Sequence, residues 1–171
     1  QDGSGTNWLD LFTSSTYNDN NWHHVGCTRS GTAMKIYIDG ALAASGNTAG
    51  VTNLSNASTL KLGANPCVYL NGSLDEVRLW NTARTCDEIS QLRNCELVGN
   101  ETGLVAYYKF NQGYASASNP TVTTLTDATA NANNGTLTNF ALSGSTSNWV
   151  APGGVTTGTS CPAVTAPEAD L

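Results

Sequence analysis

The segment AMKIYIDGALAAS, residues 33–45, constrains the fold more than any other stretch of the chain. Its first half alternates in polarity, with three apolar side chains at every second position: Met34, Ile36 and Ile38. A period of two sends these side chains to one face of a β-strand. Asp39-Gly40 follows, and such a dipeptide closes two-residue hairpins because both positions tolerate a positive φ. The segment therefore predicts two antiparallel strands joined by a tight turn.

Most of the remaining chain has the same character. Short runs of β-forming residues alternate with stretches rich in Gly, Asn, Ser and Thr, as in an antiparallel β-sandwich. The predicted runs cover residues 7–15, 21–30, 59–64, 73–80, 103–110, 121–125 and 135–142. Residues 151–171 have the composition of a linker or tail. We predict an all-β domain over residues 1–150, followed by this tail.

One short helix interrupts the strands. Thr85 and Glu88 stand three residues apart, as in a capping box, where each side chain binds the other residue's backbone N–H. Ile89 and Leu92 then supply an apolar stripe at helical spacing. The helix is predicted to end near Asn94.

The composition of the chain argues against two classes of partner, nucleic acid and the membrane interior. Charged residues make up 12% of the chain, the net charge is −6, and only seven Lys and Arg are present. Nucleic-acid binding requires clustered cations, so we expect no nucleic-acid partner. No run of about 18 apolar residues occurs, so no membrane span is predicted. The polar, weakly charged composition is common among secreted all-β proteins.

Five cysteines occur, and none forms a C-x-x-C pair, which argues against a thiolate zinc site. Disulfides in an oxidising compartment are the better interpretation. We predict the pairs Cys86–Cys95 and Cys27–Cys67. The odd number leaves one cysteine over, and Cys161 in the tail is the candidate.

The adjacent acids Asp75 and Glu76 lie in the predicted strand 73–80. Strand geometry sends them to opposite faces. Glu76 shares its face with Arg78, which predicts a surface ion pair of small energetic value, and Asp75 points toward the core. Glycosidases need two carboxyl groups that face one sugar bond. This pair therefore does not predict catalysis.

The segment DATANANNG, residues 127–135, places oxygen-bearing side chains at alternate positions. Hard cations such as calcium prefer oxygen ligands. Two interpretations stay open, a polar turn and a calcium loop. If Asp75 lies beside this loop, one ion would neutralise its inward carboxylate. The predicted metal ligands are Asp75, Asp127, Asn131 and Asn133.

Other candidate site residues are aromatic or basic. Tyr69 and Tyr114 lie beside loops, where an aromatic ring can stack on a sugar. His23 and His24 alternate across the predicted strand 21–30 and so cannot hold a metal together. No convincing Ser-His-Asp arrangement is present.

Several of these motifs together resemble a known family. The motifs are NWHHV, IYIDG and NGSLDEVRLW, within roughly residues 5–92. They resemble the second half of a LamG-type, concanavalin A-like jelly roll. The family's usual opening strands are not found before Gln1. Either the chain is a fragment, or another chain supplies those strands, or residues 103–140 fold back and replace them.

The resemblance implies a non-catalytic extracellular module for binding or adhesion, secreted or on the cell surface. Its partner would be a glycan or protein of a cell surface or matrix, and a structural calcium ion near residues 75–78 is common in such domains. One alternative is a structural subunit of an extracellular fibre that assembles through sheet edges. A lesser alternative is a glycan-degrading enzyme of the same fold, since fold alone does not name the function.

Overall fold

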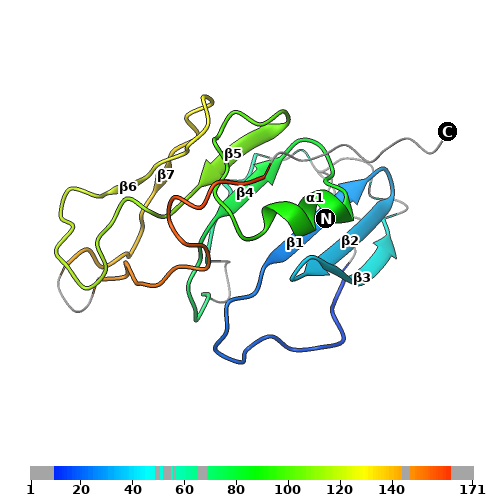
Figure 1. Cartoon of the computed structure of the whole chain (residues 1–171), viewed down its shortest axis with the longest axis horizontal. Helices are drawn as coiled ribbons and strands as arrows, with labels where there is room; N and C mark the ends of the chain where they lie inside the picture. The colour runs from blue at the N-terminus through cyan, green and yellow to red at the C-terminus, as the bar shows by residue number, and fades with distance from the viewer. Residues whose placement is uncertain are drawn as a thin grey trace.

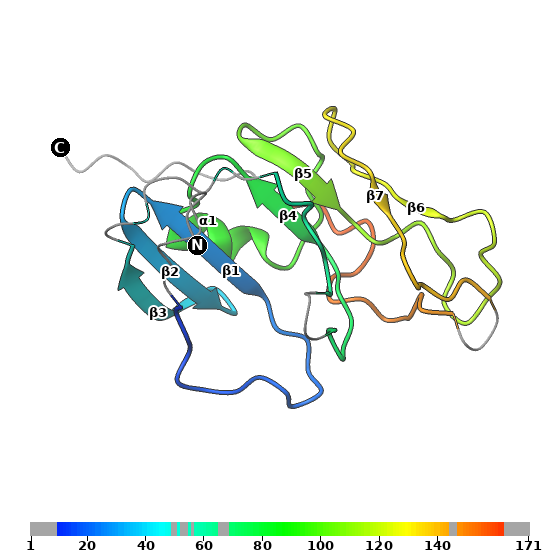
Figure 2. The same ribbon diagram turned by 180° about the vertical axis from the view of Figure 1, so that it is seen from behind.

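The computed structural model describes residues 10–48, 51, 55, 57–64, 69–143 and 147–162. Within them the protein is all-β and antiparallel with one helix, as predicted. Three small sheets lie in a row, with β1–β3 at one end, β4–β5 in the middle and β6–β7 at the other end (Figures 1 and 2). In the described ranges no helix has the length and apolar character needed to cross a membrane.

The first sheet contains the predicted hairpin. Its strands are β1 (Val25–Ser30), β2 (Ala33–Ile38) and β3 (Ala41–Asn47), in the order β1-β2-β3. The turn residues Asp39 and Gly40 have φ values of 52° and 85°, as a turn of this type requires. A Cβ at Gly40 would lie 3.1 Å from the Cα of Ser90, so glycine also permits the close approach of the helix.

The other two sheets are smaller. Strand β4 (Val77–Trp80) pairs with β5 (Leu104–Tyr108), and β6 (Thr124–Leu125) pairs with β7 (Gly135–Thr136). The predicted runs are all shorter or missing among the described residues. Residues 10–15 form no strand, and 59–64 contribute only an isolated bridge between Ala64 and Tyr69. The runs 21–30, 73–80, 103–110, 121–125 and 135–142 are reduced to β1, β4, β5, β6 and β7. Residues 7–9 of the predicted run 7–15 lie outside the described residues.

Helix α1 (Cys86–Leu92) confirms the predicted capping box. The Thr85 hydroxyl accepts from the Glu88 N–H at 3.2 Å, and a Glu88 carboxylate oxygen accepts from the Thr85 N–H at 2.8 Å. Ile89 and Leu92 are the buried residues of the helix. Ile89 lies against Gly26 of β1, so the predicted apolar stripe packs the helix on the first sheet.

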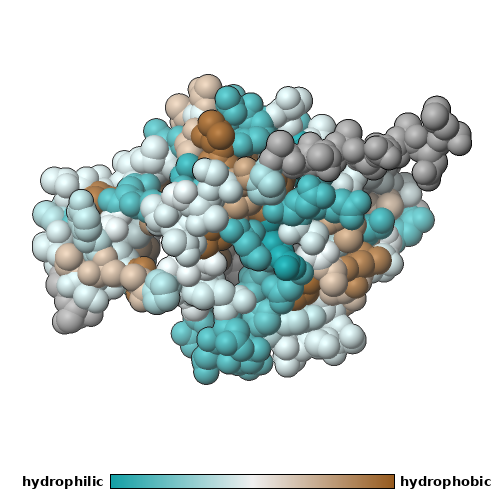
Figure 3. Space-filling view, viewed as in Figure 1, coloured by the Kyte–Doolittle hydropathy of each residue, from teal (hydrophilic) through white to brown (hydrophobic). Residues whose placement is uncertain are grey.

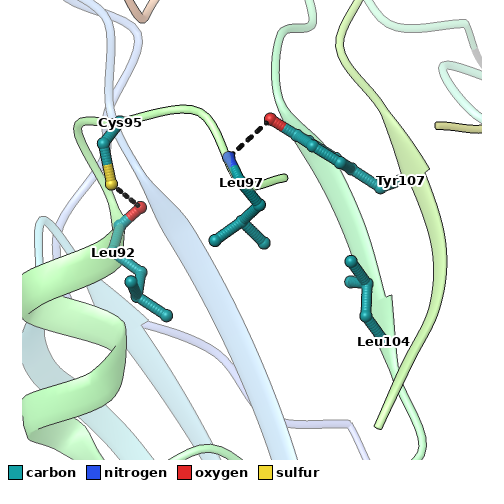
Figure 4. Packing of buried hydrophobic residues seen from close by; sticks show 5 residues of the cluster. All are labelled: Leu92, Cys95, Leu97, Leu104 and Tyr107. Carbon is teal, nitrogen blue, oxygen red and sulfur yellow. Dashed lines mark hydrogen bonds between the residues drawn. The ribbon is translucent and has the colours of Figure 1, made fainter. Parts of the chain in front are cut away.

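Strand β5 lies between two apolar clusters. On one side, Ala106 and Tyr108 pack with Leu125 and Trp149. The opposite cluster, drawn in Figure 4, comprises Leu92, Cys95, Leu97, Leu104 and Tyr107. There the Tyr107 hydroxyl accepts a hydrogen bond from the Leu97 N–H at 3.1 Å (Figure 4).

The disulfide differs from both predicted pairs. Cys95 is bonded to Cys161, which the sequence analysis left unpaired, so the prediction of Cys86 with Cys95 is wrong. Cys27 and Cys86 carry free thiols. Cys67 lies outside the described residues, and the free Cys27 thiol does not support the pair Cys27–Cys67.

The residues after position 150 are attached to the domain as far as Cys161. Ser160 forms a parallel bridge with Glu96, and the Val155 N–H donates to the Asp75 carboxylate at 3.0 Å. The described part of the predicted tail is therefore held by backbone and covalent contacts. The division of the chain at residue 150 stays a prediction.

Candidate functional site

A cleft opens between the first sheet and the segment that leads into α1. Its volume is about 360 Å³. Thr28 and Ser30 come from β1, and Lys35 and Tyr37 come from β2. The described lining residues are Thr28, Ser30, Ala33, Lys35, Tyr37, Ala83, Arg84, Thr85 and Cys86. Strand alternation places the four named sheet residues on one face, opposite Met34, Ile36 and Ile38.

Arg84 forms part of the opposite wall and is held in place by its neighbours. Its guanidinium carbon lies 3.9 Å from the centroid of the Trp80 ring, and Nη1 lies 3.0 Å from a Glu88 carboxylate oxygen. Nη2 donates to the Thr82 hydroxyl and to the Thr102 carbonyl at 2.9 and 2.7 Å. Stacking and a fork of donors make arginine suited to such a fixed position.

No pattern in the sequence predicted this cleft. The alternation in β2 could have shown that Lys35 and Tyr37 share a face. No local pattern shows that residues 83–86, nearly fifty positions later, cover that face. Their placement follows from packing of α1 on the sheet, which is a long-range effect.

The acidic pair lies outside the cleft, and the structure corrects the prediction for Glu76. The strand begins only at Val77, and Glu76 has a φ of 54°, which breaks the strand period used in the prediction. The Glu76 side chain is 8% exposed and that of Arg78 is 9% exposed, with 2.6 Å between Oε2 and Nη2. The ion pair is thus buried, not on the surface.

A hydrogen-bond network surrounds this pair. The Tyr107 hydroxyl donates to Glu76 Oε2 at 2.5 Å, and Arg78 donates to the carbonyl oxygens of Leu92, at 2.6 Å, and of Cys95. Burial raises the pKa of Glu76, although the hydrogen bonds from Tyr107 and Arg78 oppose this. Burial and the Glu76 carboxylate raise the pKa of Tyr107. The network joins β4, β5 and the end of α1, so its position indicates a structural role.

Asp75 has different neighbours. Its Oδ2 accepts from the Val155 N–H, and a Cβ at Gly153 would lie 2.5 Å from the same oxygen. The carboxylate is half-buried and lies against the segment that follows residue 150. The Asp75 carboxylate thus contacts a backbone donor of the segment after residue 150.

Asp127 is the centre of a second network. Its carboxylate accepts at 2.9 Å from the backbone N–H groups of Tyr107, Thr129 and Asn133, and also from the Thr129 hydroxyl. Burial would raise the pKa of Asp127, but the three backbone donors hold it below its ordinary value. These hydrogen bonds hold the loop of residues 127–133 against β5.

The four predicted metal ligands do not meet at one point. Asn131 and Asn133 donate through their side-chain amides to the Val105 carbonyl, on the same edge of β5 as Asp127. Asp75 instead binds Val155. Since donors already surround the Asp127 carboxylate, these residues as arranged do not fit a shared calcium ion. Among the described residues, no group of three or more His, Cys, Asp and Glu is placed to hold a metal.

Replacement of Asp127 by asparagine tests the structural role of this carboxylate. We expect the free energy of unfolding to fall by about 2–3 kcal/mol, because an amide nitrogen cannot accept the bonds made to one oxygen. Urea denaturation measures the change. Asp10→Asn, at an exposed position, is the control and should change stability by less than about 0.5 kcal/mol. Equal stability of the two variants would contradict the assigned role.

The His23 imidazole lies between two carboxylates. Its Nδ1 lies 2.8 Å from Asp39 Oδ2, and its Nε2 lies 3.1 Å from Asp19 Oδ1. The hydrogen bond with Asp39, followed by that with Asp19, raises the pKa of His23. Burial lowers the pKa of His24. The two adjacent histidines are therefore expected to titrate on opposite sides of the ordinary value.

An NMR titration of the two imidazoles checks this expectation. The His23 pKa should lie above about 6.5 and the His24 pKa below it. Because the folded-state pKa of His23 is raised, the stability it contributes is present below about pH 6.5 and is lost as pH rises through the raised value. Asp39→Asn keeps the turn and should lower the His23 pKa. An unchanged value would show that the carboxylate does not act on the ring.

The two tyrosines predicted to stack on a sugar lie outside the cleft. Tyr69 is 78% exposed and Tyr114 is 77% exposed. Neither lines the cleft. Their role in ligand binding stays a prediction.

Residues 1–90 match the family model described as the concanavalin A-like lectin/glucanases superfamily. A crystal structure of an S-layer domain-containing protein (residues 221–444) from Clostridium thermocellum is 26% identical, with a TM-score of 0.40, and the match covers 48% of this chain and 43% of that one. No curated protein matches the sequence. The family model covers more than half of the chain, and the chain therefore belongs to the concanavalin A-like lectin/glucanase superfamily.

Proposed function

We propose that the protein is a non-catalytic extracellular binding module for a glycan or protein ligand, and a glycan is the better candidate. The observation that carries this proposal is the cleft beside β2. It offers hydroxyl groups from both walls, and no acidic side chain is among the described residues that line it. A ligand could bind there, whereas glycoside hydrolysis by the usual mechanism needs two facing carboxyl groups.

Several acids outside the cleft have partners within the protein, which supports the non-catalytic assignment. Glu76 and Asp127 are engaged in the two structural networks described above. Asp19 and Asp39 flank His23. The disulfide Cys95–Cys161 supports an extracellular location, because disulfides persist in oxidising compartments.

Binding and turnover by the purified chain test the proposal. Immobilised glycans and matrix proteins are offered as ligands, and the same soluble polysaccharides are incubated with the chain and analysed for shorter products. We expect binding to at least one ligand and no new reducing ends. Release of oligosaccharides would overturn the non-catalytic assignment, and lack of binding to the whole panel would overturn the binding assignment.

Calcium stays a separate proposal. An ion at residues 127–133 would have to replace donors that now hold the Asp127 carboxylate. The unfolding temperature with millimolar calcium and with a chelator tests it. A higher unfolding temperature with calcium, abolished by Asp127→Asn, would support a calcium site. Equal unfolding temperatures with calcium and with chelator would contradict it.

Self-assembly through sheet edges is a second candidate function. Within the described part of the chain, β1 and β3 are the two edge strands of the first sheet. Unpaired edges can pair with another strand. Exposed apolar residues on the face in Figure 3 form several separate groups and not one large patch. Sedimentation of the purified chain decides: a monomer at micromolar concentration contradicts assembly.

A further inference from the structure

We propose that the cleft beside β2 selects an acidic sugar, one that carries a carboxylate or a sulfate group, with Lys35 as the contact for the anion. The inference rests on the proposed binding function and adds the class of ligand and the residues that recognise it. Three features of the described residues support it: the charge of the lining, its hydroxyl groups and the preformed walls.

The charge of the lining is opposite to that of the chain. The protein has 13 Asp and Glu against seven Lys and Arg, yet both charged residues of the lining, Lys35 and Arg84, are cations. The Glu88 carboxylate partly neutralises Arg84. Lys35 forms no ion pair with any described residue. An anion in the cleft would therefore meet an uncompensated ammonium group.

Hydroxyl-bearing side chains line the sheet wall of the cleft. Tyr37, a residue that is 4% exposed, is one of them. The hydroxyls of Thr28 and Ser30 lie on the same wall. Hydroxyl groups both donate and accept, which suits the alternating donors and acceptors of a sugar.

Contacts within the protein hold both walls in place. Tyr37 and Lys35 lie in the central strand of the three-stranded sheet, and the opposite wall is fixed by the Arg84–Trp80 stack and the capping box. The volume of about 360 Å³ lies within the range of known small-ligand sites, about 300–1,000 Å³. A preformed site loses little conformational entropy on binding, so a short oligosaccharide could be held by few polar contacts.

Calorimetric titration of the full chain tests the selectivity. The probes are oligogalacturonate, which carries carboxylates, sulfated carrageenan oligosaccharide, and neutral cello-oligosaccharide of similar length. We expect one or both acidic probes to bind at least about tenfold more tightly than the neutral one. The two acidic probes distinguish carboxylate from sulfate.

Two variants locate the site. Lys35→Gln removes an exposed charge without a protein partner, and Tyr37→Phe removes only a hydroxyl. Each should weaken binding of the acidic probe about tenfold, as expected for loss of one hydrogen bond to a charged or buried group. Lys61→Gln, at an exposed position outside the cleft, is the matched control and should leave affinity unchanged. Circular dichroism shows that each variant is folded.

The free thiols provide an independent readout. Cys86 lines the cleft and Cys27 does not, and both are exposed. The acidic probe should slow alkylation of Cys86 and leave the alkylation rate of Cys27 unchanged. Peptide mass spectrometry measures both rates. Equal protection of both thiols would place the ligand elsewhere and overturn the proposed site.

The remaining outcomes separate this inference from the broader proposal. Equal affinity for neutral and acidic probes, or no effect of Lys35→Gln, overturns the acidic-sugar inference and leaves the binding function in place. Tighter binding of a polyglutamate peptide than of either acidic sugar also overturns it. Failure of every glycan and protein ligand overturns the binding function itself.

Discussion

Replacing Arg78 by alanine is expected to lower the free energy of unfolding by about 3–5 kcal/mol. The variant would leave the buried Glu76 carboxylate without its cation and the carbonyl oxygens of Leu92 and Cys95 without their donor. A buried charge that loses its partner is among the most destabilising changes in a protein. Urea denaturation followed by tryptophan fluorescence measures the loss.

Two further variants sharpen this test. Arg78→Lys keeps the charge but has a single nitrogen in place of the fork, so its stability should lie between those of the wild type and the alanine variant. Lys61→Ala, at an exposed position, should change stability by less than about 0.5 kcal/mol. A loss below about 1 kcal/mol for Arg78→Ala would show that the pair contributes little.

Loss of the disulfide is expected to have a similar effect. Cys95 and Cys161 are 66 residues apart, and closing a loop of that length restricts the unfolded chain by about 4 kcal/mol in the chain-entropy model. Cys161→Ser should lower the free energy of unfolding by about that amount. Cys86→Ser removes an exposed free thiol and is the control.

Reduction of the wild type gives a second measurement of the same bond. The reduced protein and Cys161→Ser should unfold at similar urea concentrations, since both lack the cross-link. If the serine variant is as stable as the oxidised wild type, the bond does not restrict the unfolded chain as assigned.

Local sequence patterns predicted the elements whose conformation depends on neighbouring residues. Asp39-Gly40 defined the hairpin, because both residues take the left-handed φ values that the turn needs. Thr85 and Glu88 defined the start of α1 through their reciprocal hydrogen bonds. Both features are complete within a few residues of sequence.

The prediction that Asp75 and Glu76 lie on opposite faces of one strand failed at a specific backbone angle. The assignment of faces assumed that the strand continued through residues 73–76, but Glu76 takes a left-handed conformation. Its carboxylate turns toward Tyr107 and Arg78 and is buried. A non-glycine residue with positive φ is uncommon, and no local pattern marks this position.

Contacts between distant segments could not be predicted from composition. The loop 127–133 was rich in oxygen atoms, and its principal partners proved to be backbone groups of β5, some 20 residues earlier. The disulfide and the cleft also join remote parts of the chain. Spacing alone does not reveal which distant segments fold together.

The position of β5 determines how the protein should unfold. Tyr107 belongs to one apolar cluster, and its neighbours Ala106 and Tyr108 belong to the other. Any shift of this strand that loosens one cluster must also displace side chains of the other. The two clusters are thus mechanically coupled, and the middle of the molecule should melt in a single cooperative step.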